Sequence, residues 1–165
     1  MSETPHLICL LLGSNIKAEE NLPKAVTLLQ QQVNVLQSSS VWESPALGSD
    51  GPNFLNAAVL AMTSLDAVSL KKQVLRPLEA QLGRVRTEDK KAPRTIDIDI
   101  IIYDKKLLDP FLWQHAHMAV PLAEILPDYQ SESGIYLKDF ATSLIPISSI
   151  WAREDFSGYP FSTIF

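Results

Sequence analysis

Four stretches of the chain have the hydrophobic patterns of β-strands. Residues 7–12 are continuously apolar and end at Gly13, which predicts a strand buried on both faces and then a turn. Residues 33–43 and 53–62 place apolar side chains on alternate positions, and residues 96–103 are rich in isoleucine. Alternation and β-branched residues both favour extended structure, so we expect four strands.

Two stretches between these strands have helical spacing instead. In residues 21–32 the apolar side chains recur every three or four positions, and Pro23 falls in the first turn, where its missing N–H costs nothing. Residues 66–82 follow the same spacing, with Asp66 as the N-cap. Pro77 interrupts this second pattern, which predicts a kink or a break there.

The predicted order is strand, helix, strand, strand, helix, strand, which is the split βαβ or ferredoxin-like arrangement. It implies an α+β fold in which a four-stranded antiparallel sheet carries both long helices on one face. We expect a single domain over residues 1–165, with its core at about residues 5–104. Residues 105–165 are expected to form a C-terminal extension packed on that core, and residues 121–127 a helical turn or a loop.

Composition narrows the classes of protein. Charged residues make up 20% and hydrophobic residues 46% of the chain, as in ordinary globular proteins. The net charge of −5 argues against a nucleic-acid-binding module, which carries a basic face. Cys9 is the only cysteine, so no internal disulfide can form, which fits a reducing compartment. No apolar run is long enough to span a membrane, and the N-terminus lacks the basic region of a signal peptide, so we expect a cytoplasmic protein.

Two aspartates open the isoleucine-rich strand. Asp97 and Asp99 are two positions apart, so an extended chain points both carboxylates to one face, roughly 6–7 Å apart. Carboxylates at this distance can share one or two hard cations, and Mg²⁺ is usually held by one or two carboxylates together with water and substrate phosphate. The alternative is that the pair only forms ion pairs with arginines on the surface.

Three arginines lie upstream of that strand. They are Arg84, Arg86 and Arg94, and Pro93 fixes the backbone just before the last of them. A guanidinium group binds phosphate oxygens through two parallel hydrogen bonds. The carboxylates and the arginines together predict a site for a magnesium-bound polyphosphate.

Two further features stay open between a structural and a functional interpretation. Asn56 lies among apolar neighbours of the third strand, and is either a hydrogen-bonded core residue or an amide that donates to and accepts from a heterocyclic ligand. His115 and His117 are two positions apart, but no further His or Cys cluster completes a zinc site. We expect one of these histidines to bind phosphate or only to pack.

Five segments of the chain match the motifs of one enzyme family in the same order. They are Leu12-Gly13-Ser14-Asn15; Ser44-Pro45 with Leu47-Gly48; Phe54-Leu55-Asn56-Ala57-Ala58; Glu79 with Gly83-Arg84-Val85-Arg86; and Pro93-Arg94-Thr95-Ile96-Asp97-Ile98-Asp99. The last segment, of the form P-R-x-x-D-x-D, is the most specific. On these segments, about residues 7–103, the chain resembles the 6-hydroxymethyl-7,8-dihydropterin pyrophosphokinases of folate biosynthesis.

This resemblance implies a ferredoxin-like enzyme that transfers pyrophosphate from ATP, its co-substrate, to the hydroxymethyl group of the pterin and releases AMP. It implies that Asp97 and Asp99 bind two Mg²⁺ ions and act in catalysis with Arg84 and Arg94. The residues it assigns to ATP are Glu79, Arg84, Arg86, Arg94 and His117. Those it assigns to the pterin are Ser44, Pro45, Leu47, Phe54 and Asn56. We expect no nucleic-acid or membrane partner, and a monomer.

The chain departs from the family pattern after the aspartate strand. Family members carry an Arg-x-Phe segment before a Pro-Leu pair; its phenylalanine stacks on the pterin and its arginine touches ATP. Here Pro121-Leu122 follows His117 almost at once, so the segment is absent. Lys91 or a neighbour also stands where the family has a tryptophan. Trp113 is our first candidate to replace the stacking ring, and an aromatic residue of the C-terminal region is the alternative.

Two other classes of protein share parts of this pattern. One is a ferredoxin-like RNA-binding module, which would need exposed aromatic and basic residues on the sheet face, and the negative net charge opposes it. The other is a catalytically weak relative that keeps the fold and a nucleotide site as a regulatory or interaction protein, which the missing segment favours. Release of AMP with and without the pterin distinguishes the enzyme from both.

Overall fold

The computed structural model of the chain describes residues 4–156 and 160–161. Its strands are β1 (His6–Ser14), β2 (Asn34–Ser38), β3 (Trp42–Ser44), β4 (Phe54–Thr63), β5 (Asp97–Tyr103), β6 (Lys106–Leu107) and β7 (Trp151–Ala152). Its helices are α1 (Ala18–Gln32), α2 (Ala67–Leu70), α3 (Arg76–Gln81), α4 (Ala116–Ile125) and α5 (Leu137–Leu144). A π-helical turn (Lys71–Leu75) joins α2 to α3, and short 3₁₀ turns lie at Pro110–Trp113, Ile145–Ile147 and Glu154–Phe156. Within these described ranges no helix is both long and apolar enough to cross a membrane.

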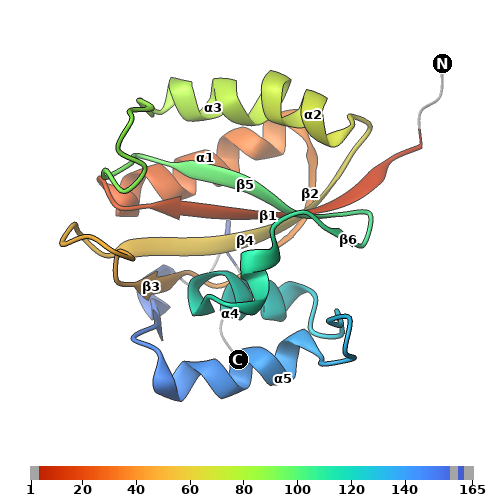
Figure 1. The fold of residues 1–165 in the computed structure, drawn as a ribbon. Helices are drawn as coiled ribbons and strands as arrows, with labels where there is room; N and C mark the ends of the chain where they lie inside the picture. The colour runs from red at the N-terminus through yellow and green to blue at the C-terminus, as the bar shows by residue number, and fades with distance from the viewer. Residues whose placement is uncertain (1–3, 157–159, 162–165) are drawn as a thin grey trace.

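The sheet lies between two layers of helices (Figure 1). α1 and the α2–α3 segment cover one face, and α4 and α5 lie against the other. The strand order is β6-β5-β1-β4-β3-β7, with β2 also paired to β4, and every pair is antiparallel. The predicted α+β, ferredoxin-like class is confirmed, and the short strands β6 and β7 extend its sheet at the two edges.

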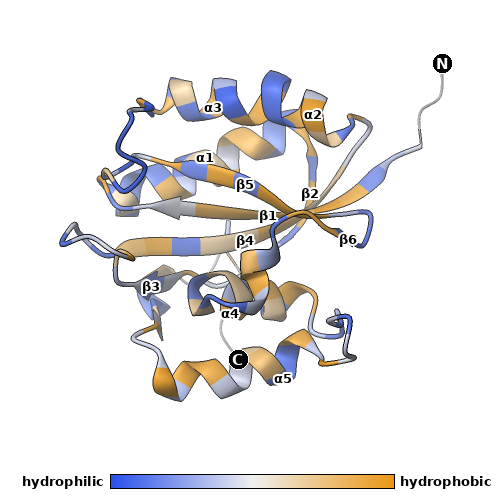
Figure 2. Ribbon diagram, in the orientation of Figure 1, coloured by the Kyte–Doolittle hydropathy of each residue, from blue (hydrophilic) through white to orange (hydrophobic). Residues whose placement is uncertain are grey.

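The central strand β1 is apolar along most of its length because both of its faces are covered. Leu10 and Leu12 belong to the core under α1 and the α2–α3 segment. Cys9 and Leu11 belong to a second core that includes Met118 of α4. Hydrophobic colour accordingly runs along β1, β4 and β5 (Figure 2). This explains why the strand reads as a continuous apolar run rather than as an alternating one.

The strand expected over residues 33–43 is interrupted in the structure. β2 and β3 both pair with β4, and the residues between them leave the ladder. Ser39 bridges the gap, since its N–H donates to the Ala58 carbonyl at 2.8 Å and its Oγ accepts from the Ala58 N–H at 2.8 Å. The side-chain hydroxyl therefore replaces a backbone acceptor at the break.

Both helix predictions need a correction at a proline. α1 begins at Ala18, after Lys17 in a left-handed conformation, so Pro23 lies inside the helix rather than in its first turn. Pro77 causes no break, because a π-helical turn comes directly before this residue, which has no N–H of its own. In that turn the Arg76 N–H donates to the Lys71 carbonyl, five residues back. α2 and α3 therefore continue along one line (Figure 1).

The segment after β6 is more ordered than expected. The loop or single turn predicted for residues 121–127 is wrong, because α4 runs through Pro121 to Ile125. α4 is apolar on nearly all sides since it lies between the sheet and α5. Further along, β7 pairs with β3 and ties the extension to the sheet edge. Residues 157–159 and 162–165 of the expected extension lie outside the described residues.

Truncation of a core side chain in β1 tests this layering. Leu10 is fully buried, so we expect Leu10→Ala to lower the free energy of unfolding by about 2–5 kcal/mol. Leu36 of β2 is 51% exposed, and Leu36→Ala should change it by no more than about 0.5 kcal/mol. Urea unfolding followed by circular dichroism measures both; equal losses would contradict the assigned core.

Candidate active site

The register of the sheet brings separate motifs into rows. Gly13 of β1 lies opposite Asn56 of β4 on one side and opposite Asp97 of β5 on the other. Leu11 lies opposite Asp99 in the next row of the same face. Directly opposed residues of antiparallel strands point to one face. The amide and the two carboxylates therefore share a face, and glycine leaves the space between Asn56 and Asp97 free of a side chain.

A cavity of about 190 Å³ lies over these rows. The sheet, the loop after β3, the loop before β5 and the start of α4 all contribute to its wall. Its lining residues are Leu11, Gly13, Ser44, Pro45, Ala46, Leu47, Ser49, Phe54, Asn56, Lys90, Lys91, Arg94, Asp97, Asp99 and His117. All five residues predicted to bind the pterin therefore meet both aspartates, Arg94 and His117 in one cavity.

The two aspartates occupy different electrostatic surroundings. Arg94 Nη1 lies 3.0 Å from Asp97 Oδ2, and Arg86 Nη2 lies 3.8 Å from Asp97 Oδ1. Asp99 has no ion pair among the described residues. Burial, and next the charge of Asp97, raise the pKa of Asp99 to about 7. A cation bound between the two carboxylates would remove this repulsion.

Arg94 is held from three directions. Its N–H donates to Asn15 Oδ1 at 2.8 Å, and its carbonyl accepts from the Asn15 N–H at 3.1 Å. Its guanidinium contacts Asp97 and the Lys90 carbonyl, and lies 5.9 Å from the centre of the Phe54 ring. The sequence match included Asn15 without a role for it. The structure assigns it the anchoring of the arginine loop to the end of β1.

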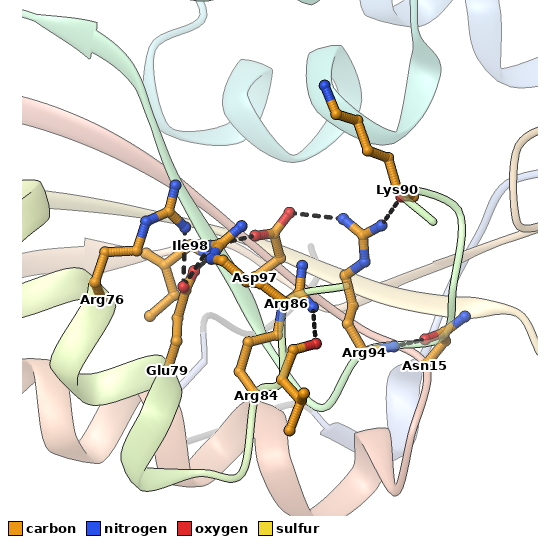
Figure 3. Close-up of polar contacts among 10 residues, drawn as sticks. Asn15, Arg76, Glu79, Arg84, Arg86, Lys90, Arg94, Asp97 and Ile98 are labelled. Atoms are coloured by element: carbon orange, nitrogen blue, oxygen red, sulfur yellow. Dashed lines mark hydrogen bonds and ion pairs between the residues drawn. The ribbon is translucent and has the colours of Figure 1, made fainter. Parts of the chain in front are cut away.

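Glu79 is the buried centre of a second group of contacts (Figure 3). Its side chain is 1% exposed, and burial raises its pKa to about 7. Oε1 accepts from Arg76 Nη1 at 2.9 Å and from Arg86 Nη2 at 2.7 Å. Oε2 accepts from the N–H of Ile98 at 2.8 Å, between the two aspartates. Glu79 does not line the cavity; its contacts hold Arg76, Arg86 and the backbone between the aspartates in place.

Two of the predicted arginines do not line the cavity. Arg84 Nη1 donates to the Val85 carbonyl at 2.9 Å, and Arg86 is held by Glu79. Lys90 and Lys91 do line the cavity, although the sequence assigned them no role. Lys91 packs on Gly48 of the facing loop: a Cβ built there would lie 2.8 Å from Nζ. The sequence signal for a role of these lysines was their position as two consecutive cationic residues directly after Glu88 and Asp89.

The end of the cavity opposite the aspartates is built around Asn56. Its side chain is buried, and Nδ2 donates to Ser44 Oγ at 2.8 Å and to the Trp42 carbonyl at 3.1 Å. A carbonyl can only accept, so this contact fixes which way the amide points. Oδ1 has no hydrogen-bond partner among the described residues. Asn56 is therefore both a packed core residue and an amide with one acceptor left for a ligand.

Trp113 does not supply the replacement ring. Trp113 stacks on Tyr129 at 6.4 Å and tilts against Phe140 at 5.2 Å in the second core, away from the cavity lining. The expectation that it stands over the pterin is therefore wrong, because α5 covers it. His117 does reach the cavity, and its ring stacks on His115 at 5.4 Å.

The donor set fits a hard cation bound together with a substrate. Across the residues that the structure describes, no group of three or more His, Cys, Asp or Glu side chains forms a complete metal cage. Asp97 and Asp99, the two carboxylates among the residues that line the cavity, offer oxygen ligands, which suits Mg²⁺, since this ion keeps water and takes phosphate oxygens as further ligands. Arg94, which lines the cavity, has a buried Nε without a partner in the described chain, as expected where an anion belongs.

The pKa of His117 gives a testable dependence of stability on pH. Burial, and next the neighbouring His115, lower this pKa to about 4. Between pH 4 and about 6.5 the unfolded chain binds a proton that the folded chain does not, so stability decreases as the pH falls through this window. At pH 4.5 we expect wild type to lose about 2–3 kcal/mol more than His117→Asn, relative to pH 7.

Urea unfolding of both proteins at pH 4.5 and 7 measures this difference. Glu79 and Asp99 titrate in both proteins, so their contributions cancel in the comparison. An equal loss of stability in the two proteins would show that His117 titrates normally.

Comparison with known proteins identifies the family. The model of the 7,8-dihydro-6-hydroxymethylpterin-pyrophosphokinase family matches residues 9–127. The pyrophosphokinase of Bacillus subtilis is 35% identical over 134 residues, which are 74% of this chain and 79% of that protein. The enzyme of the same name from Methylorubrum extorquens is 41% identical over 105 residues, 58% of this chain and 65% of that protein.

Solved structures support the fold. A Plasmodium falciparum HPPK-DHPS crystal structure matches 88% of this chain with a TM-score of 0.70 at 11% sequence identity. The chain spans 46% of that longer protein. Since the family model matches well over half of the sequence, the chain belongs to the 7,8-dihydro-6-hydroxymethylpterin-pyrophosphokinase family.

Proposed function

We propose that this chain transfers pyrophosphate from ATP to the hydroxymethyl group of 6-hydroxymethyl-7,8-dihydropterin, releasing AMP. The observation that carries this function is the shared cavity, in which the polar acceptor of Asn56 and the carboxylates of Asp97 and Asp99 face the same space. One end suits a flat heterocycle with hydrogen-bond donors. The other end suits a phosphate chain with its cations, so the two substrates would meet between them.

At the pterin end, the residues bind and orient. Asn56 Oδ1 accepts from an N–H of the heterocycle, while the Ser44 and Trp42 contacts keep the amide from turning. The backbone from Pro45 to Leu47 closes one side and the Phe54 ring another. A group aligned in this way reacts as if at high local concentration.

At the phosphate end, the residues balance charge. Arg94 and the two lysines of the loop bring positive charge to the cavity, and Asp97 and Asp99 would hold Mg²⁺. When bound, Mg²⁺ neutralises phosphate charge and makes the phosphorus accessible to the hydroxyl group. We infer two ions, as the family pattern implies. Glu79 keeps the backbone between the aspartates in place through Ile98.

We also propose that the chain acts as one domain, since β7 of the extension joins the same sheet as the core strands. We propose a monomer that works in the cytoplasm, where ATP is available and the single Cys9 stays reduced. Sedimentation equilibrium tests the monomer directly.

Release of AMP from magnesium ATP, measured with and without 6-hydroxymethyl-7,8-dihydropterin, tests the proposed function. An enzyme of this class forms AMP only when the pterin is present. A ferredoxin-like binding module, or a relative that only binds nucleotide, forms none under either condition.

The absence of the Arg-x-Phe segment should show in pterin affinity. Stacking of one aromatic ring contributes roughly 0.5–1.5 kcal/mol, so we expect the pterin to bind about tenfold more weakly than in a relative that keeps the segment. Calorimetric titration of the pterin into both proteins measures this. Equal affinities would mean that another cavity residue has taken over the contact.

A further inference from the structure

Arg76 of α3 is a cation beside the site that the proposed function does not use. Its side chain is 32% exposed, and Nη1 donates to Glu79 Oε1 at 2.9 Å. Three positions separate the two residues along the helix. On its own, such a contact is an ordinary helix ion pair with a small effect on stability.

Arg76 shares its partner, Glu79, with Arg86. The same oxygen of Glu79 also accepts from Arg86 Nη2 at 2.7 Å, and the other oxygen accepts from the N–H of Ile98. Two guanidinium groups thus share one carboxylate that is 1% exposed. Arg86 has a second carboxylate in Asp97, 3.8 Å away, whereas Arg76 has only its share of Glu79 among the described residues. Arg76 is therefore the guanidinium of this cluster that can take a further anion.

Arg76 is linked to the strand that carries the aspartates. Glu79 connects Arg76 to this strand, because its other oxygen accepts from the N–H of Ile98, between Asp97 and Asp99. Arg76 and Arg94 lie on opposite sides of Asp97 (Figure 3). The remaining guanidinium nitrogens of Arg76 have no hydrogen-bond partner in the described ranges of the chain. The π-helical turn that ends at Leu75 fixes the direction in which this side chain leaves the helix.

We propose that Arg76 is a phosphate-binding residue for the nucleotide, held by Glu79 beside Asp99 on the side of the aspartates away from Arg94. This inference rests on the proposed function, because it takes the nucleotide as the ligand of the aspartate end. A guanidinium fork positioned by a buried carboxylate loses little freedom when it binds phosphate oxygens. Arg76 and Arg94 would then hold the phosphate chain from two sides.

The test compares Arg76→Gln and Arg76→Lys with wild type. Lys24→Gln is the matched control, since Lys24 is an exposed cation of α1 and its loss changes the net charge equally. The probes are magnesium with α,β-methylene ATP, AMP, and the pterin, each titrated by calorimetry. Thermal unfolding of every variant is recorded alongside.

For Arg76→Gln we expect about tenfold weaker binding of α,β-methylene ATP, which corresponds to about 1.4 kcal/mol. Binding of AMP should weaken less, and binding of the pterin should not change. Arg76→Lys should recover most of the affinity, because the positive charge is kept. Binding of the ATP analogue should also depend less on salt in Arg76→Gln, since one charge contact is lost.

Unchanged affinity of Arg76→Gln for the ATP analogue would overturn the inference. Parallel weakening of the analogue and the pterin with a lower unfolding temperature would also overturn it, since Arg76 would then act only as a structural partner of Glu79. The proposed function fails separately. If Arg76→Gln weakens binding of the analogue but wild type forms no AMP, the role of Arg76 holds and the proposed activity fails. If wild type and Arg76→Gln form AMP equally and bind the analogue equally, the activity holds and the role of Arg76 fails.

Discussion

Replacement of Asp97 or Asp99 by asparagine is expected to lower magnesium-dependent turnover by about 10²–10³-fold, because each carboxylate contributes a preorganised charge where the phosphate charge develops. Both side chains line the cavity from the N-terminal end of β5. Asparagine keeps the shape of the side chain and removes its charge, so packing should survive. Steady-state rates of AMP release at saturating magnesium and ATP measure the effect.

Thermal unfolding of the same variants separates lost chemistry from lost structure. The pKa of Asp99 is raised in the folded protein, so its ionised form disfavours folding at neutral pH. Asp99→Asn should therefore unfold at the same temperature as wild type or at a higher one, while turnover falls. Normal turnover in both variants would show that these aspartates are not the metal ligands.

Alanine at Arg94 is expected to cost more turnover than alanine at Arg86, by about 10²-fold against about tenfold. Arg94 lines the cavity, its side chain is 18% exposed, and Asn15 and Asp97 fix its direction. Arg86 is 47% exposed and contacts Glu79 from outside the cavity. A guanidinium that is already in place can stabilise the transition state without a cost for ordering it.

Comparison of kcat and KM shows where each arginine acts. For Arg94→Ala we expect most of the loss in kcat, whereas for Arg86→Ala we expect a modest loss because Glu79 keeps Arg76 and Ile98 as partners. Losses of equal size in both variants, confined to the KM for ATP, would contradict this ranking.

Local sequence patterns were sufficient for the core of the fold. β1 and β5 are long apolar runs that no competing pattern obscures, and the two-residue spacing of Asp97 and Asp99 fixes their common face. That Asn56 lies in the same cavity as the aspartates could be predicted only through the family motifs. It depends on the register of Gly13, which no local pattern encodes.

The sequence failed where distant segments decide the outcome. α4 looked like a loop because of its prolines, but burial between the sheet and α5 stabilises it as a helix. The sequence made Trp113 a candidate for contact with the ligand, but in the structure α5 packs on it through Phe140. The three donors to Glu79 come from α3, the arginine loop and β5, so this group of contacts could not be predicted from any one local segment.

The identity of the products tests the central claim most directly. ³¹P NMR of the chain with magnesium, ATP and 6-hydroxymethyl-7,8-dihydropterin distinguishes attack on the β-phosphorus of ATP from attack on the γ-phosphorus. We predict equal amounts of AMP and of a pterin ester that carries two coupled phosphorus signals, because the transferred group is pyrophosphate. ADP with a pterin ester of a single phosphate, or no pterin-dependent product at all, would contradict it.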